Sequence, residues 1–173
     1  MAELSGGAKL EAYLKDMESK VSNASTLNVG FPEGSTYPDG TSVAMIAAIQ
    51  NFGAPSRGIP PRPFFSNMIK AKGDEWPDTL GGLLNHYGMD AGKALTALGA
   101  HIGGQLGESI DETNSPPNSP VTNLLKQRFP MGGQKFADVL QARHDVANGA
   151  TAPAGKPLVQ SGFMAQSITS VVK

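Results

Sequence analysis

The sequence of 173 residues contains no cysteine, which excludes disulfide bonds, thiolate metal sites and cysteine nucleophiles. It also has no excess of charge of one sign, because 14 lysines and arginines oppose 15 aspartates and glutamates, for a formal net charge of −1. We therefore expect no general attraction to nucleic acid or to a membrane surface. No segment approaches the ~18 apolar residues of a membrane span, and the N-terminus lacks the pattern of a secretory signal. These absences predict a protein that is made in the cytoplasm and has no membrane partner.

The motifs of common enzymes and metal proteins are also missing. His86, His101 and His144 lie far apart and in no metal-ligand spacing, so we expect surface or hydrogen-bonded histidines and no metal. The sequence has no P-loop, no nucleophile elbow and no glycine-rich dinucleotide loop. The adjacent acidic pairs at 74–75 and 111–112 lie next to predicted helix ends, where solvated charges are the usual outcome. We assign no catalytic residue and no cofactor, and an enzyme stays an alternative because a hydrolase triad need not be close in sequence.

Glycine and proline are plentiful instead, with 21 and 13 residues, and they separate segments of regular periodicity. Apolar residues at helical spacing predict helices near 5–21, 42–52, 64–72, 89–110 and within 132–149, and a short helix or turn at 121–129. The predicted fold class is α+β: a small, mainly antiparallel sheet that includes residues 26–31 and 167–172, packed by several helices on one face, with extended proline-rich loops.

We expect a single domain over residues 1–173, in which 127–156 form an inserted helix and an extended connector. In that inserted helix, the side chains predicted to face inward are Phe136, Val139, Leu140 and Val146.

Three glycines recur every four residues on the longest predicted helix: Gly99, Gly103 and Gly107. Each costs the helix about 1 kcal/mol relative to alanine, so three on one stripe indicate that another backbone approaches closely. Packing within the chain and contact with a neighbouring subunit both satisfy this pattern.

The most unusual stretch is IQNFGAPSRGIPPRPFF at residues 49–65. Thr41 or Ser42 can cap the helix that leads into it, and Gly53 can end that helix in a left-handed conformation. The prolines fix their own dihedral angles and extend the residues before them, so this segment is a stiff arm that loses little entropy on docking.

Three side chains of this arm are candidates for recognition. Arg62 lies between prolines and can offer a planar guanidinium to a carboxylate. Phe64 and Phe65 begin a helix and point in different directions, so one ring can anchor the core while the other faces the arm or a partner. The alternative is an internal loop with both rings buried in the same subunit.

A longer pattern covers most of the chain. It consists of VAMIAAIQNFG followed by IPPRPFF within residues 43–65, SPPNSPVT at 115–122, and PLVQSGFMAQSI at 157–168. In this order the three segments resemble the motifs of small neck and tail-completion proteins of tailed bacteriophages, with Ser161 and Met164 where threonine and leucine are usual. The stretch between the second and third segments is longer than is usual in that family, which is why 127–156 is treated as an insertion.

The resemblance implies a non-enzymatic virion protein that forms a homo-oligomeric ring, expected to have six subunits, at the head-proximal end of the tail or in the neck. Such a ring completes the tail and enables head-tail joining. Its implied partners are the tail tube protein and the head-tail connector proteins, and DNA passes through the lumen without specific binding. We expect synthesis in the host bacterial cytoplasm, before assembly into the virion.

The resemblance leaves alternatives within and outside this class. It does not separate a tail terminator from a tail completion protein, and a tail-tube or head-connector subunit is the nearest rival, followed by a phage-encoded enzyme or regulator. The residues expected at the assembly interface are Asn51, Phe52, Arg62, Phe64 and Phe65, with Gly99, Gly103 and Gly107 as a second contact.

Overall fold

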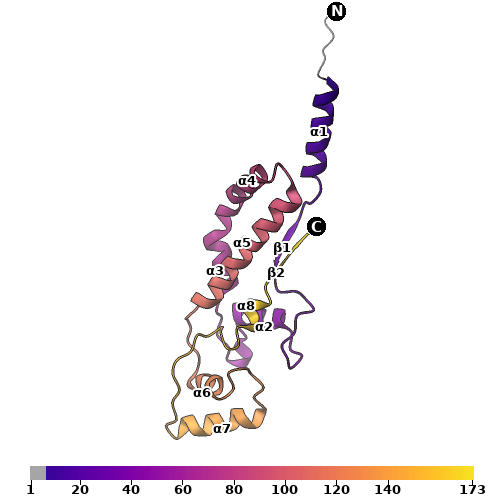
Figure 1. Cartoon of the computed structure of the whole chain (residues 1–173). Helices are drawn as coiled ribbons and strands as arrows, with labels where there is room; N and C mark the ends of the chain where they lie inside the picture. The colour runs from indigo at the N-terminus through magenta and orange to yellow at the C-terminus, as the bar shows by residue number, and fades with distance from the viewer. Residues whose placement is uncertain (1–6) are drawn as a thin grey trace, which may run out of the picture. The chain divides into compact units, whose positions relative to one another are not determined.

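A computed structural model describes residues 7–173, and the predicted helix start near Ser5 lies outside them. The helices are α1 (Gly7–Val21), α2 (Val43–Phe52), α3 (Phe64–Lys72), α4 (Trp76–His86), α5 (Ala91–Glu112), α6 (Pro120–Arg128), α7 (Phe136–Ala147) and α8 (Phe163–Gln166). Short 3₁₀ turns, η1 (Pro55–Arg57) and η2 (Gly73–Glu75), precede α3 and α4, and the strands are β1 (Leu27–Gly30) and β2 (Thr169–Val172). Helices together with a small antiparallel sheet confirm the predicted α+β class (Figure 1).

The chain forms two compact units, each assembled from segments that are far apart in sequence. The first unit comprises residues 7–30, 72–104 and 169–173 of the described chain, and the second comprises 31–71 and 105–168. Because the segments of the two units alternate along the sequence, neither unit is a continuous N-terminal or C-terminal domain.

The small sheet belongs to the first unit. β1 pairs with β2 in antiparallel register, with Leu27 opposite Val172 and Gly30 opposite Thr169, so both segments that were predicted for the small sheet are strands of it (Figure 1). The pairing continues past the strands, because the N–H of Lys173 donates to the carbonyl of Thr26 at 2.9 Å. The buried apolar residues of α5 in this unit are Ala91, Ala94, Leu98 and Ile102.

Asn23 ties the chain that follows α1 to the start of α5. Its Oδ1 accepts from the N–H of Gly92 at 2.8 Å, and its Nδ2 donates to Oδ1 of Asp90 at 3.1 Å. The same Asp90 oxygen accepts from the N–H of Lys93 at 3.0 Å, as an N-cap carboxylate does. The Lys93 amide and the Asn23 side chain together lower the pKa of Asp90 to about 2.

The core of the second unit is built around Phe64, the first residue of α3. Its ring meets those of Phe31 and Phe65 edge-on, with centroids 6.4 Å apart in both pairs. Ser109 of α5 donates its hydroxyl to the Phe64 carbonyl at 2.8 Å, so a hydrogen bond fixes the start of α3 to α5. The other buried apolar residues of this unit are Val43, Ala47, Met68, Leu106, Ile110, Leu124, Ala142, Leu158 and Met164.

The helix predicted within 127–156 is present as α7, and it packs beside α6 (Figure 1). The predicted inward face was partly wrong, because Phe136 is 76% exposed and Leu140 is also exposed. The buried residue is Ala142, and Val139 and Val146 lie three before and four after it, on the same helical face. A small alanine at the centre of that face allows close packing, which leaves the larger side chains of the neighbouring stripe outside.

Candidate functional site

The stretch that carries the resemblance begins with a cap that joins two helices. Asn51, in the last turn of α2, is buried, and its Oδ1 accepts from the N–H groups of Phe65 and Ser66 at 3.0 and 3.2 Å. Its Nδ2 donates to the Ser66 hydroxyl at 2.9 Å. Asn51 therefore satisfies amides in the first turn of α3 that have no partner within their own helix.

Gly53 ends α2, as the sequence predicts, with its N–H donating to the Ile49 carbonyl at 2.8 Å. Its φ of 77° is positive, but its ψ of 173° is extended rather than left-handed helical, so the chain turns away sharply. A Cβ at this position would lie 2.8 Å from the backbone nitrogen of Pro61, closer than real Cβ atoms approach. Two backbone bonds between Ala54 and Ile59, of 2.9 and 3.1 Å, close the loop that follows. Only glycine fits this turn without displacing the proline segment.

Arg62 points inward, which corrects the expectation that it projects from a docking arm. Only 5% of the residue is exposed. Its Nε donates to the Pro116 carbonyl at 2.8 Å, its Nη2 to the Pro117 carbonyl at 3.2 Å, and its Nη1 to Oε1 of Gln50 at 2.9 Å. The fork expected to receive a carboxylate is thus occupied by oxygens of the same unit, because the extended prolines aim it across the fold toward residues 116–117.

Lys126 of α6 plays a similar part on the other side of the same loops. Its Nζ donates to the carbonyls of Lys156, Pro157 and Val159 at 2.8, 3.0 and 2.9 Å, which uses all three protons of the ammonium group. Burial, and secondarily the charge of Arg62, lower the pKa of Lys126 to about 8. Burial also lowers the pKa of Arg62.

These two cations line a groove of about 1000 Å³ in the second unit. Neither makes an ion pair with a carboxylate among the described residues. The lining contains one carboxylate, Asp39, which accepts from the N–H of Thr41 at 2.9 Å, and it contains no histidine. The groove therefore brings together hydrogen-bonded anchors of the surrounding loops.

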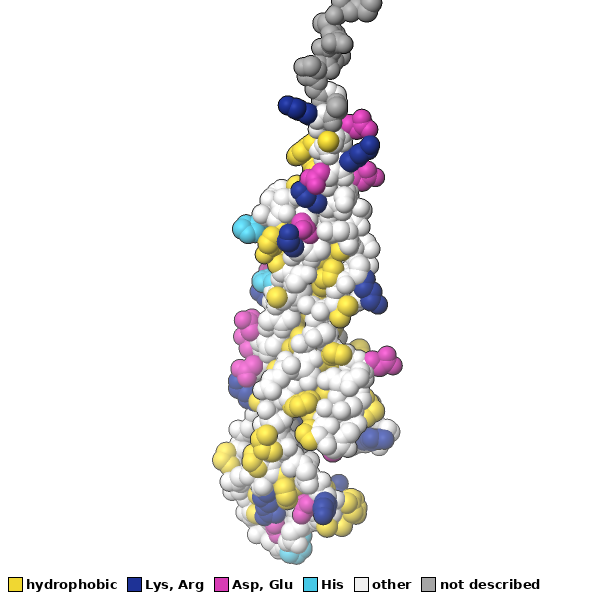
Figure 2. Space-filling model, turned by 45° about the vertical axis from the view of Figure 1, so that its right-hand side comes forward, with side chains coloured by type: hydrophobic (Ala, Val, Ile, Leu, Met, Phe, Trp, Pro, Cys, Tyr) yellow, Lys and Arg dark blue, Asp and Glu magenta, His cyan; other side chains and the backbone are white. Residues whose placement is uncertain are grey.

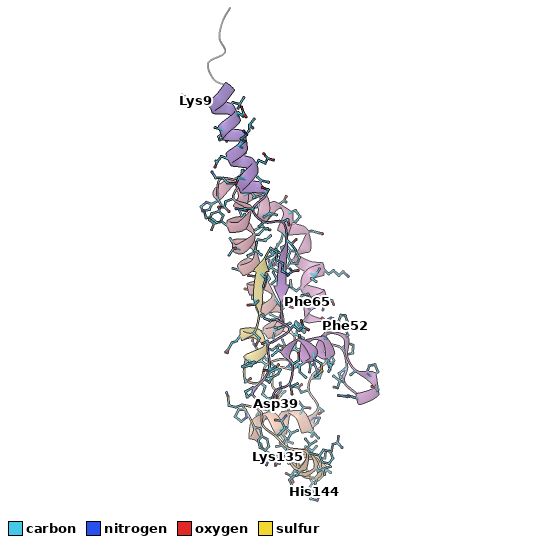
Figure 3. All side chains as sticks on the ribbon, turned by 90° about the vertical axis from the view of Figure 1, so that its right-hand side faces the viewer. Lys9, Asp39, Phe52, Phe65, Lys135 and His144 are labelled. Atoms are coloured by element: carbon cyan, nitrogen blue, oxygen red, sulfur yellow. The ribbon has the colours of Figure 1, made fainter. Side chains whose placement is uncertain are left out.

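The three phenylalanines expected at an interface are in different environments. Phe64 is buried in the core and Phe65 is half-buried against it. Phe52, at the C-terminal end of α2, is 74% exposed (Figure 3). It shares an outer face of α2 with exposed Met45 and Ala48, which precede it by seven and four residues. Of the five residues expected from the 51–65 stretch, Asn51, Arg62 and Phe64 serve the subunit interior, and Phe52 is free to meet a partner.

The glycine stripe contacts the same chain at two of its three positions. A Cβ on Gly99 would lie 2.7 Å from Cβ of Ser170, so β2 approaches α5 closely within the first unit. A Cβ on Gly107, in the second unit, would lie 3.9 Å from the Ile168 Cδ1, an ordinary packing distance. Gly103 is half-buried. Packing within the chain, one of the two interpretations of the stripe, accounts for Gly99.

Two anchors of this site were missed at the sequence level. Gln50 stands beside Asn51 but gave no signal, because a glutamine near a helix end is usually solvated. The sequence places Lys126 in a short helix but does not indicate its partners, because its acceptors are backbone carbonyls, which every residue carries. Among the described residues no group of histidine and acidic side chains could hold a metal ion. None of the helices described here is long and apolar enough to cross a membrane.

The histidines lie outside the groove. The nearest charged neighbour of His101 is Glu75, 3.9 Å away, and that of His144 is Asp145, 3.7 Å away. A comparison with protein families, curated proteins and solved structures finds no match to this chain.

Proposed function

We propose that this chain is a structural virion protein that forms a ring at the head-proximal end of a phage tail or in the neck. The ring, expected to contain six subunits, completes the tail and allows the head to join it. Its partners on this proposal are the tail tube protein and the head-tail connector proteins.

One observation carries the proposal: the three segments on which the resemblance rests meet in the second unit. Arg62 of the first segment binds the Pro116 and Pro117 carbonyls of the second. Lys126, just beyond the second segment, binds the carbonyls of Pro157 and Val159 in the third. Segments that are far apart in sequence are thus joined by two cations, the buried Arg62 and the half-buried Lys126, as parts of one structural element would be. This convergence supports a common structural role for the three segments. Short motifs that matched by chance would have no reason to meet in one unit.

The outer face of α2 supplies the apolar surface that assembly requires. Exposed Phe52 and Met45 lie on a helix that is otherwise fixed, since its end is held by Asn51 and Gly53. A rigidly held aromatic ring loses little entropy when a partner covers it, which makes it a good anchor for an interface. The formal net charge of −1 suits a ring through which DNA passes without being gripped.

The test is the mass of the purified protein by light scattering, alone and after mixing with particles from a phage mutant that lacks this gene. A ring-sized mass, or a monomer that becomes a ring on the particle and restores head joining, supports the proposal. Phe52→Ala should weaken ring formation, whereas Phe136→Ala, at a ring of the same type and similar exposure, should not. A wild-type monomer that never enters the particle would overturn the proposal, and so would salt-dependent tight binding of DNA.

A further inference from the structure

The groove of the second unit carries positive charge that the described chain does not neutralise. Arg62 and Lys126 both line it, and neither has a carboxylate partner among residues 7–173. Burial lowers the pKa of Lys126 to about 8, and the charge of Arg62 adds to this shift, so the two cations repel each other. The groove lining contains one carboxylate, Asp39, which already accepts from the N–H of Thr41. An anion that entered the groove would offset this repulsion and favour the charged form of Lys126.

Hydrogen-bond donors are also left over in the groove. Arg62 donates through each of its nitrogens, but Nη1 and Nη2 carry two protons each and have one acceptor apiece among the described residues. The N–H groups of Gly133 and Gln134, which line the same groove, have no acceptor among residues 7–173. A Cβ on Gly132 or Gly133 would meet open space, so another chain can approach this backbone closely. These unused donors suit a ligand that is rich in acceptors and negatively charged.

Apolar side chains make up much of the groove wall. The rings of Tyr37 and Phe163 pack together with centroids 5.2 Å apart, and Ile46 and Leu158 belong to the same lining. Figure 2 shows apolar and basic side chains at the surface in the lower part of the view, where α6 and α7 lie. The groove volume of about 1000 Å³ is at the upper end for ligand sites and far exceeds what one carboxylate group requires. The ligand that fits therefore carries apolar groups beside its negative charge.

We propose that the groove binds an extended segment of a partner protein in which an acidic side chain stands between apolar ones. The acidic side chain meets Arg62 and Lys126, the backbone of the segment accepts from Gly133 and Gln134, and its apolar side chains pack on the walls. A nucleic acid duplex fits less well, because Arg62 is only 5% exposed and lies out of reach of duplex phosphates, whereas a single side chain can enter the groove. This contact is separate from the ring contact proposed through α2 and does not depend on it.

Fluorescence polarisation with two labelled peptides tests the requirement for a carboxylate. The probe has the sequence Ala-Leu-Glu-Leu-Ala, with its ends blocked by the label and an amide, and in the control peptide glutamine replaces glutamate. The glutamate peptide should bind about ten-fold more tightly, because a hydrogen bond to an ionised acceptor is roughly twice as strong as a neutral one. Equal affinities, or no binding of either peptide, would overturn the proposal. Displacement of the peptide by equal concentrations of sodium acetate, inorganic phosphate or a DNA duplex would also overturn it, since the groove would then be a site for those anions.

Charge variants locate the binding in the groove. Lys126→Met should weaken binding of the glutamate peptide about ten-fold, whereas Lys70→Met, which removes an exposed charge of the same unit outside the groove, should leave it unchanged.

A second variant keeps both cations and their hydrogen bonds, because Lys126 also holds loop carbonyls. Gln134→Glu adds a negative charge at an exposed residue of the groove lining and should weaken binding of the glutamate peptide. Asn67→Asp adds the same charge at an exposed residue outside the groove and should leave the affinity unchanged. Unchanged affinity in Gln134→Glu would overturn the proposal. Peptide affinity is measured independently of particle mass, so a failed ring and a failed groove are distinguishable.

Discussion

The turn at Gly53 gives the sharpest quantitative test of the fold. We consider Gly53→Ala, which adds one methyl group to a residue with φ of 77° and ψ of 173°. The new Cβ would lie 2.8 Å from the nitrogen of Pro61 and 3.0 Å from the Ile59 carbonyl oxygen. Both neighbours are backbone atoms, and the Ile59 carbonyl also accepts the bond from Ala54 that closes the loop. Relief of the clash therefore requires movement of the proline segment itself.

The expected cost has two parts. A non-glycine residue in so sparsely populated a backbone region costs about 1–3 kcal/mol, and forcing an extra methyl group into packed surroundings costs about 1–3 kcal/mol more. Two other glycines calibrate the sum. Gly58 is left-handed, with φ of 66°, but has open space around it, so Gly58→Ala should cost about 1 kcal/mol. Gly81 lies inside α4 in open space, so Gly81→Ala should stabilise the helix by up to about 1 kcal/mol.

The assay is urea unfolding followed by circular dichroism at fixed protein concentration, with the midpoint compared among the three variants. We expect the urea midpoint of Gly81→Ala to lie above that of the wild type. The midpoint of Gly58→Ala should lie slightly below the wild type, and that of Gly53→Ala well below both. If Gly53→Ala unfolded at the same midpoint as Gly58→Ala, the close approach of Pro61 to the end of α2 would be refuted.

Three further predictions concern the stripe, the buried arginine and the cap of α5. Gly99→Ala should lower the urea midpoint because its Cβ would clash with Ser170, whereas Gly107→Ala should keep or raise the midpoint. An equal decrease of the midpoint in both variants would contradict the close approach of Ser170 to Gly99. Arg62→Lys should lower the free energy of unfolding, measured by the same urea titration, by about 2 kcal/mol, since one ammonium group cannot reach all three acceptors of Arg62. An unchanged free energy of unfolding would contradict the structural role of these three hydrogen bonds. The pKa of Asp90 is lowered to about 2, so its stabilisation is complete above about pH 4 and lost as the pH falls through 2. The stability difference between wild type and Asp90→Asn should therefore shrink between pH 5 and pH 2, and a constant difference would refute the linkage.

Local features of the fold could be predicted because their causes are close in sequence. Ser42 caps α2 by accepting from the N–H of Met45 at 3.3 Å, and Gly53 ends the same helix, as the sequence indicates. The paired strands were found because alternation in 26–31 and the β-branched residues of 167–172 each mark a strand on their own. The antiparallel direction agrees with the predicted sheet, whereas the pairing of these two strands with each other and their register come from the structure alone.

Features that depend on distant backbone atoms could not be predicted. The acceptors of Arg62 are the carbonyls of Pro116 and Pro117, and every residue carries such a carbonyl, so no residue type marks the partner. The face of α7 was mistaken for a similar reason. Burial there follows Ala142, whose small size matters only beside α6, whereas sequence patterns give more weight to the large ring of Phe136.

The sequence Asn51-Phe52-Gly53 places an exposed aromatic residue between two residues that the fold needs. The Asn51 side chain is held by the first turn of α3, and Gly53 is confined by Pro61, so the backbone on both sides of Phe52 is fixed. The exposed ring therefore projects from a rigid position instead of a flexible loop. On the proposed function, substitution of Asn51 or Gly53 should weaken assembly by releasing Phe52, even though Asn51 is buried and Gly53 has no side chain to offer a partner. If the proposed function holds, this coupling would explain how the motif marks an interface although Asn51 itself is buried.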